Sequence, residues 1–126
     1  MESCVFCERA NSGEVSQSNE IGVTFSDQYP ISPGHTLIIP RRHEANFIDI
    51  STTDQMRLWE LVDDVVQHLQ ESMSPDGFNI GVNAGSAAGQ TIDHAHIHVI
   101  PRFHGDVEDP KGGVRWVIPH KAKYWS

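Results

Sequence analysis

The chain has 126 residues and a formal net charge of −8, with 9 Lys and Arg against 17 Asp and Glu. This length suits one domain with one core, and the acidic balance argues against nucleic acid as a partner because phosphate backbones require a basic face. No apolar run reaches the roughly 18 residues that cross a bilayer, and residues 1–4 lack a secretory signal. We therefore expect a cytoplasmic protein that does not bind membranes.

The first half of the chain begins with a pair of cysteines, Cys4 and Cys7, in C-x-x-C spacing. In a reducing compartment this spacing favours metal binding or redox chemistry over a structural disulfide. The polar residues 9–19 predict a loop, and residues 21–25 predict an edge strand because they alternate weakly and include β-branched side chains. After a proline-rich loop, the apolar residues 35–40 predict a buried strand with His35 at its entrance.

A connection over residues 41–50, with one helical turn at 44–47, leads to a long helix that begins at residues 51–53. Thr52 followed by Gln55 fits a capping box, and Asp54 adds negative charge at the positive end of the helix. Apolar residues then recur every three or four positions until Ser74, which predicts a helix that packs one side against a core. This stripe consists of Leu58, Val62, Val65, Leu69 and Met73.

The second half of the chain predicts a strand over residues 78–83, a loop of small residues over 84–91 and a strand over 93–101. Residues 102–126 are rich in Gly and Pro and are expected to wrap the outside. Because strands adjacent in sequence usually pair, the fold class is α+β. It comprises an antiparallel sheet of about five strands with one long helix and a short helix packed on it.

His94, His96 and His98 alternate with apolar residues in the last predicted strand. Side chains two apart on a strand share a face, which predicts a row of imidazoles at steps of roughly 6 to 7 Å. Such a row fits nucleophilic catalysis on phosphorus, in which one neutral imidazole attacks and a cationic one neutralises phosphoryl charge. It also fits a catalytic zinc site, or a stack of histidines that only satisfy one another.

The residues just before this row favour phosphoryl chemistry. Gly85, Gly89, Gln90 and Thr91 offer backbone N–H groups, an amide and a hydroxyl, which are the groups that bind phosphate oxygens. A zinc site would need carboxylate groups around its ligands, and Asp93 is the only acid adjacent in the sequence.

The sequence His94–Ile100 resembles the His-φ-His-φ-His-φ-φ motif (φ apolar) of the histidine triad (HIT) family of nucleotide hydrolases and transferases. Pro33–Pro40 is similar to the family's first conserved strand, and Asn83–Thr91 to its phosphate loop. The resemblance covers nearly the whole chain and implies a single HIT domain over residues 1–126. Within it, residues 1–20 form an N-terminal zinc-binding segment and residues 102–126 a C-terminal tail.

The resemblance also implies a two-step mechanism. His96 attacks the α-phosphate of a nucleotide and forms a nucleotidyl-histidine that water then opens, while His98 binds a non-bridging oxygen. The main-chain carbonyl of His94 holds the Nδ1–H of His96, and His35 lies against the same cluster. The implied nucleotide-binding residues are Asp27 on the ribose, Asn83 near the leaving group, and Gly89, Gln90 and Thr91 on phosphate, with Phe6, Ile21, Phe25 and Leu37 as candidates for the base pocket.

Family members that begin with Cys-x-x-Cys resemble zinc proteins in which two histidines complete the site. The implied ligands are Cys4, Cys7, His43 and His94, a closed Cys2His2 set suited to one structural Zn²⁺ per chain. A transient disulfide or two idle thiols is the alternative. No cofactor is expected for the chemistry itself.

Two branches of the family remain open as expectations, the dinucleoside polyphosphate hydrolases and the nucleoside phosphoramidases. The tail resembles the first branch, whereas Asp27 and Asn83 resemble the second, and Arg102 or Arg115 is either a distal phosphate ligand or surface charge. The partner is a purine nucleotide such as an AMP-containing dinucleotide or phosphoramidate. A homodimer is expected, with Trp59, Trp116 and Trp125 as interface candidates.

The alternative to an enzyme is a nucleotide-binding regulatory module whose turnover of nucleotides is incidental.

Overall fold

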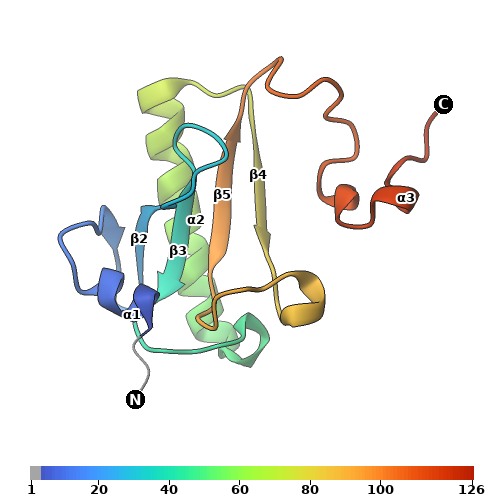
Figure 1. Ribbon diagram of the computed structural model, residues 1–126. Coiled ribbons are helices and arrows are strands. Elements are labelled where there is room, and N and C mark those ends of the chain that lie inside the picture. Colours follow the sequence, from blue (N-terminus) through green and yellow to red (C-terminus); the bar gives the residue numbers. More distant parts are fainter. Residues whose placement is uncertain (1–3) are drawn as a thin grey trace.

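The computed structural model describes residues 4–126, so the first three residues of the predicted N-terminal segment lie outside the described residues. Figure 1 shows one antiparallel sheet in the order β1-β2-β3-β5-β4, with the long helix α2 across one face. The α+β architecture is as predicted. The strands are β1 (Gln17–Ser18), β2 (Gly22–Ser26), β3 (Thr36–Pro40), β4 (Gly77–Val82) and β5 (Ile97–Arg102), and the helices are α1 (Val5–Ala10), α2 (Thr52–Met73) and α3 (Pro119–Ala122), with 3-10 turns η1 (Phe47–Asp49), η2 (Ser86–Ala88) and η3 (Gly113–Val117).

The N-terminal segment is more ordered than the predicted loop over residues 9–19. Helix α1 extends to Ala10, and Cys4 caps it by accepting the N–H of Cys7 on its Sγ at 3.4 Å. Strand β1 pairs with β2 over only two residues, yet this makes β2 an interior strand and not the predicted edge strand. Both elements are too short to leave a periodic pattern in the sequence.

The N-cap of helix α2 lies one residue earlier than predicted. Ser51, not Thr52, is the N-cap, and its hydroxyl accepts the N–H of Asp54 at 3.2 Å. Gln55 does not close a capping box, because its amide donates to the carbonyl of Ile50 at 2.9 Å. The short turn before the helix lies at η1 and not at residues 44–47. The helix ends at Met73, and its C-cap residue Ser74 has a left-handed conformation (φ 48°).

The two faces of the sheet differ in what covers them. The face toward α2 carries the main core, to which β5 contributes Ile97 and Val99. On the opposite face, α1 covers only the β2–β3 end, where it packs Phe6 and Ala10 against a second core of Val23, Phe25, Leu37 and Ile39. The β5–β4 part of this second face is left open to a cavity, and β5 presents His98 and Ile100 there.

The C-terminal segment after β5 leaves the sheet and lies beside β4, apart from the rest of the chain (Figure 1). Its base is fixed by Arg102, which contacts Asp106 through two hydrogen bonds of 2.7 and 2.8 Å and Asn79 through one of 2.6 Å. Among residues 4–126, no helix has both the length and the apolar character needed to span a membrane.

The close approach of α2 to β2 generates a stability prediction at Gly22. A Cβ there would lie 2.6 Å from Leu58 Cδ2 and 2.8 Å from the main-chain oxygen of Ile39, which cannot move without breaking the strand ladder. We expect Gly22→Ala to lower the free energy of unfolding by about 1–3 kcal/mol, measured by urea denaturation. The control is Gly77→Ala, because no atom lies within 4 Å of a Cβ at that position. Equal stability of the two variants would contradict the packing described.

Candidate active site

The histidine row does not lie in one continuous strand. Strand pairing in β5 begins at Ile97, so His98 belongs to the strand whereas His94 and His96 precede it in an irregular segment. The predicted strand over residues 93–101 is therefore wrong in its first part. The physical reason is that this segment bonds to the connection after β3, since the N–H of Ala95 donates to the carbonyl of Glu44 at 2.7 Å.

His96 is buried and held in one orientation by the main chain. Its Nδ1 lies 2.8 Å from the carbonyl oxygen of His94. A carbonyl only accepts, so Nδ1 carries the proton and Nε2 of the neutral ring keeps its lone pair. The Phe6 ring packs against the imidazole with its centroid 5.1 Å away and the two planes nearly perpendicular. The neutral form of this ring thus presents an oriented nitrogen with a free lone pair, and His96 lines the cavity.

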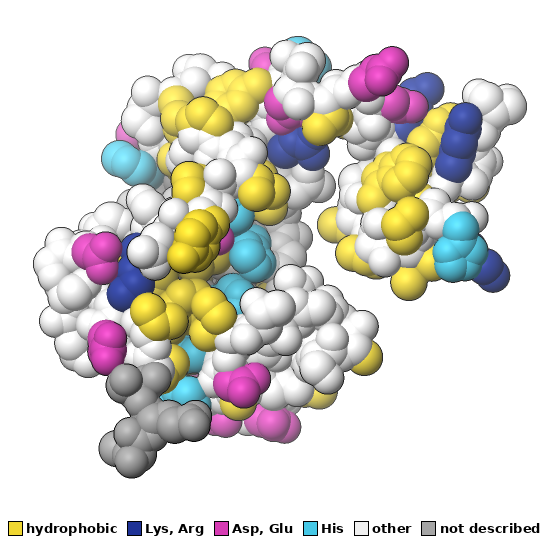
Figure 2. All heavy atoms as spheres, viewed as in Figure 1, with side chains coloured by type: hydrophobic (Ala, Val, Ile, Leu, Met, Phe, Trp, Pro, Cys, Tyr) yellow, Lys and Arg dark blue, Asp and Glu magenta, His cyan; other side chains and the backbone are white. Residues whose placement is uncertain are grey.

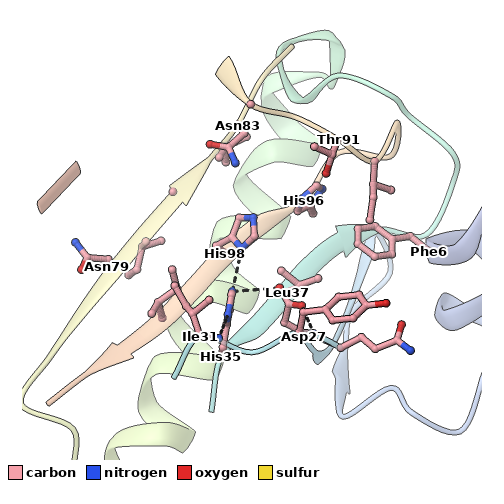
Figure 3. Close-up of a pocket in the computed structure, with 18 of the residues that line it drawn as sticks. Phe6, Asp27, Ile31, His35, Leu37, Asn79, Asn83, Thr91, His96 and His98 are labelled. Carbon is pink, nitrogen blue, oxygen red and sulfur yellow. Dashed lines mark hydrogen bonds and ion pairs between the residues drawn. The ribbon is translucent and has the colours of Figure 1, made fainter. Parts of the chain in front are cut away.

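A second chain of hydrogen bonds fixes the proton of His98. The N–H of Ile31 donates to Nδ1 of His35 at 3.3 Å, so the proton of the neutral His35 ring is on Nε2. That nitrogen lies 2.9 Å from Nδ1 of His98 and 3.3 Å from Oδ2 of Asp27, as the dashed lines in Figure 3 show. His98 consequently accepts on Nδ1 and carries its own proton on Nε2, where it can serve as a hydrogen-bond donor.

Burial favours the neutral form of His98 and of His35. Desolvation, together with the neighbouring His96 and His35, lowers the pKa of His98 from 6.5 to about 4. Desolvation also lowers the pKa of His35, although the carboxylate of Asp27 opposes this. The expectation of a cationic imidazole beside the nucleophile is therefore not supported for His98 in the ligand-free protein.

The cavity beside these histidines has a volume of about 790 Å³. Figure 2 shows histidine side chains in the hollow at the centre of this face, bordered by hydrophobic side chains. Figure 3 shows the labelled residues arranged around His96 and His98, with Phe6 and Asp27 on one side and Asn79 and Asn83 on the other. The predicted residues that line the cavity are Phe6, Asp27, His35, Leu37, Asn83, Gly89, Thr91, His96 and His98.

Three predicted binding residues do not line the cavity. Ile21 packs on the α2 core and Phe25 is fully buried in the core under α1. The amide of Gln90 is used inside the fold, because it donates to the carbonyls of Ala45 (2.6 Å) and Ile92 (2.9 Å) and accepts the N–H of Gly85 (2.9 Å). This geometry gives the Gln90 side chain a structural role and does not support its contact with phosphate.

The loop before the histidines also offers fewer free N–H groups than expected. The N–H of Gly89 donates to the carbonyl of Ser86 at 3.0 Å, and that of Gln90 to the carbonyl of Gly85 at 3.2 Å. The 3-10 turn η2 therefore satisfies these groups internally. Gly85 and Gly89 have φ of 94° and 95°, a region that favours glycine, so they shape the turn. Thr91 remains as a polar side chain of this loop at the cavity.

Four residues next to the histidine row form a candidate metal centre. The ligand atoms of Cys4, Cys7, His43 and His94 all lie within 4.8 Å of one another. Nδ1 of His94 is 3.4 Å from Cys4 Sγ and 3.5 Å from Cys7 Sγ, and Nδ1 of His43 is 3.4 Å from Cys7 Sγ. Tetrahedral zinc with ordinary bond lengths separates sulfur and nitrogen ligands by about 3.5 Å, so the donor set and its spacing fit zinc.

His94 is prepared for that role by another main-chain contact. Its Nε2 lies 2.9 Å from the carbonyl oxygen of Pro40, so Nε2 carries the proton and Nδ1 faces the cysteines with its lone pair. Both cysteines are free thiols here, not a disulfide. Because the carbonyl of the same residue holds His96, the candidate metal centre and the candidate nucleophile are adjacent through one residue.

Sequence reasoning missed part of the cavity wall. Arg9, Gln28 and Asn79 line it, although Arg9 falls in the predicted loop and Gln28 in the proline-rich loop. Alternation in strand β4 was the available signal for Asn79, which lies two residues before Gly81 on the same face.

Of the two arginines considered for a distal phosphate, Arg102 is bound to Asp106 and Asn79, and Arg115 donates to the carbonyls of Ala122 and Lys121.

Comparisons of the sequence and of the structure with known proteins all point to the same family. The HIT domain pattern matches residues 8–105. An uncharacterized HIT-like protein of Saccharolobus solfataricus is 37% identical over 82% of this chain and 76% of its own length. The asymmetrical bis(5′-nucleosyl)-tetraphosphatase of Schizosaccharomyces pombe is 33% identical over 76% of this chain and 53% of its own length. An AP-4-A phosphorylase of Mycobacterium tuberculosis is 33% identical over 62% of this chain and 40% of its own length.

Among solved structures, a Zn-bound histidine triad family protein from Mycobacterium smegmatis superposes with a TM-score of 0.76. It is 32% identical in sequence, and the alignment covers 82% of this chain and 78% of that one. This protein is therefore similar to the present chain in its three-dimensional fold as well as in its sequence.

The lowered pKa of His98 predicts a pH dependence of stability. The unfolded ring binds a proton near pH 6.5, whereas the folded ring does so only near 4. Between these values the unfolded state holds more protons, so the free energy of unfolding must decrease as the pH falls from 6.5 toward 4. Urea denaturation of wild type and His98→Asn at pH 7.5 and 5.0 measures this. We expect the wild type to lose more stability than the variant, and equal losses would contradict the neutral, buried state of His98.

Proposed function

Because the chain belongs to the HIT family of nucleotide hydrolases and transferases, we propose that it cleaves a nucleotide at the α-phosphate through a covalent intermediate on His96. The observation that carries this proposal is the hydrogen bond from His96 Nδ1 to the carbonyl of His94, 2.8 Å long. It leaves Nε2 unprotonated, fixed in direction and open to the cavity, which is what a nitrogen nucleophile requires.

In the first step, Nε2 of His96 attacks the α-phosphorus, a P–N bond forms, and the bond to the leaving group breaks with its electron pair. The leaving group takes up one proton from solvent as it departs, and the water that attacks in the second step returns one proton to solvent. In the second step a water oxygen attacks phosphorus, the P–N bond breaks, and a nucleoside monophosphate is released. His96 regains its starting state, so the protein is unchanged after one turnover.

The other cavity residues have distinct roles in these steps. His98 donates its Nε2–H to a non-bridging phosphoryl oxygen, and His35 with Asp27 fixes the position of that proton. A neutral donor aimed at the phosphoryl group stabilises developing charge without needing a proton from solvent. Thr91 contacts the phosphate, Asn83 lies near the leaving group, and Asp27 binds the ribose hydroxyls.

We also propose that Cys4, Cys7, His43 and His94 hold one structural zinc ion. The spacing of the four ligand atoms supports this, and so does the Zn-bound relative from M. smegmatis. Four protein ligands leave no open position, so the metal supplies rigidity and not reaction chemistry. It ties the N-terminal helix to His94, and thereby steadies the carbonyl that orients His96.

The leaving group belongs to one of two classes, and different observations favour each. Two of the relatives carry names of enzymes for dinucleoside tetraphosphates, which supports a polyphosphate leaving group. The charges around the cavity favour an amine, as in a nucleoside phosphoramidate. Arg9 is the only Lys or Arg among the described residues that line the cavity, whereas Glu108 and Asp109 line the adjoining hollow, which shares Ile31 and Asn79 with it. On that side a polyanionic chain would meet one arginine, Arg102, which is already paired with Asp106, and the two further carboxylates would repel it.

A homodimer also fits the exposed surface, and we propose that it forms through α2 and β4. Strand β4 lies at the edge of the sheet, and the edge of a strand offers unpaired main-chain groups to a second copy. On α2, Met56 and Trp59 are exposed apolar side chains. An aromatic side chain of this size is common in protein interfaces.

The central prediction concerns His96. We expect His96→Ala to lower kcat/KM by at least about a thousandfold on both a nucleoside phosphoramidate and diadenosine polyphosphates, because the nucleophile is lost. Mass spectrometry of wild type quenched during turnover should detect a nucleotide on His96. His68→Ala is the control, since His68 lies on α2 away from the cavity.

Equal rates for wild type and His96→Ala would refute the nucleophile. If wild type binds AMP but turns over none of the substrates, the chain is a nucleotide-binding module. Within the same panel, the charge distribution predicts a higher kcat/KM for the phosphoramidate than for the dinucleotides, and the reverse order would favour the polyphosphate class.

The zinc proposal has its own measurement. Elemental analysis of purified protein should find close to one zinc per chain, and Cys7→Ser should lose most of it because one thiolate ligand is removed. We expect that variant to melt at a lower temperature than Ser12→Ala, a nearby control outside the cluster. Zinc-free wild type of unchanged melting temperature, with both thiols open to titration, would contradict a structural metal.

A further inference from the structure

Arg9 is an unusual residue for the wall of a nucleotide cavity that is otherwise largely apolar on this side. It lies in α1, its side chain is only 12% exposed, and it lines the cavity beside Val5 and Phe6. A buried guanidinium is costly unless its donors are used, so its contacts indicate what it is positioned to do.

The known contacts of Arg9 fix the guanidinium but use only part of its hydrogen-bonding capacity. Nε donates to Glu14 Oε2 at 3.1 Å, Nη2 donates to the carbonyl of Ser26 at 2.7 Å, and the group packs 4.0 Å above the ring of Phe25. Arginine has five N–H donors, and these two bonds use one each from Nε and Nη2. Among residues 4–126, no group accepts a hydrogen bond from the remaining donors, which include both on Nη1.

The position of Arg9 matches the base end of a bound nucleotide. The Phe6 ring contacts both His96 (5.1 Å between centroids) and Phe25 (5.5 Å), and Arg9 packs on Phe25. A chain of ring contacts thus leads from His96 through Phe6 and Phe25 to Arg9. Its anchor, the carbonyl of Ser26, immediately precedes Asp27, the proposed ribose contact. The base is attached to the ribose on the side away from the phosphate, so it would reach Arg9.

We propose that Arg9 recognises the base and makes the site prefer guanine, and inosine's base hypoxanthine, over adenine. This inference rests on the proposed function, because it assumes that the α-phosphate lies at His96. A guanidinium only donates hydrogen bonds, and the O6 and N7 atoms of guanine both accept them. Adenine offers N7 but places an amino group at position 6, where a donor would face a donor. Hypoxanthine keeps O6 and N7 and lacks only the 2-amino group of guanine.

Two other roles for Arg9 predict different results. If its guanidinium only packs beneath the base, the exchange of one purine for another changes little, because every base has a π face. If it attracts the phosphate, its loss weakens all nucleotides equally. Gln28 and Tyr29, two other polar side chains that line the cavity, both donate and accept and do not favour one purine.

The test is calorimetric binding of GMP, IMP and AMP to the zinc-loaded wild-type protein. We expect GMP and IMP to bind with similar Kd and about tenfold more tightly than AMP, a difference typical of one bidentate contact. Equal Kd for all three nucleotides overturns the proposal. Tighter binding of GMP alone also overturns it, because the 2-amino group and not Arg9 would then be recognised.

Three variants assign the effect to Arg9. Arg9→Met keeps much of the aliphatic packing and should bring the three Kd values to within about twofold of one another. Arg9→Lys keeps the charge but lacks the planar fork, so it should also lose most of the preference. Arg41→Met is the matched control: Arg41 also donates to a main-chain carbonyl, that of Asn19, but does not line the cavity, so the preference should remain. A preference that survives in Arg9→Met overturns the proposal even if the wild type shows one.

The result for base preference can be distinguished from the result for the proposed hydrolysis. Binding is measured without turnover, so a guanine preference in a protein that hydrolyses nothing leaves this inference intact and refutes the enzyme. Turnover of guanosine and adenosine phosphoramidates with equal kcat/KM, together with equal Kd values, refutes the inference and leaves the enzyme intact. Thermal melts confirm that each variant is folded, and if Arg9→Met does not fold, the wild-type Kd values and Arg9→Lys still decide.

Discussion

The site depends on hydrogen bonds that fix which nitrogen of each imidazole carries its proton. The carbonyl of Pro40 takes the Nε2–H of His94, and the carbonyl of His94 takes the Nδ1–H of His96. The first bond leaves a metal-binding nitrogen facing the cysteines, and the second leaves a nucleophilic nitrogen facing the cavity. A carbonyl cannot donate, so neither ring can change tautomer without breaking a buried hydrogen bond, which costs about 1–3 kcal/mol.

The irregular segment before β5 makes this arrangement possible. In a regular strand the three rings would share one face, whereas here the ladder begins only at Ile97. The main chain at residues 94–96 is therefore free to bond with the segment after β3, and the His94 ring can enter the cysteine cluster while His96 enters the cavity. Helix α1 connects the two centres, since it carries Cys7 at the cluster and Phe6 and Arg9 at the cavity.

Much of the fold and of the site could be predicted from the sequence. The stripe of α2, the apolar run of β3 and the alternation of β4 and β5 are strong signals, and the three histidines are close enough in sequence to be placed together. The strand β1, the helix α1 and the cavity role of Arg9 could not be predicted, because they depend on pairing or packing of two to six residues with distant partners. The same reason explains Gln90, whose amide was expected at phosphate but is bonded to Ala45, a residue 45 positions away.

The proposed mechanism requires that His96 is a neutral imidazole protonated at Nδ1. Long-range ¹H–¹⁵N correlation spectra of histidine-labelled protein at pH 7.5 report the protonation of both ring nitrogens directly. We expect His96 to show a protonated Nδ1 and an unprotonated Nε2, and His98 to show the opposite tautomer. A proton on Nε2 of His96 would contradict the proposed mechanism, since that nitrogen could not then attack phosphorus.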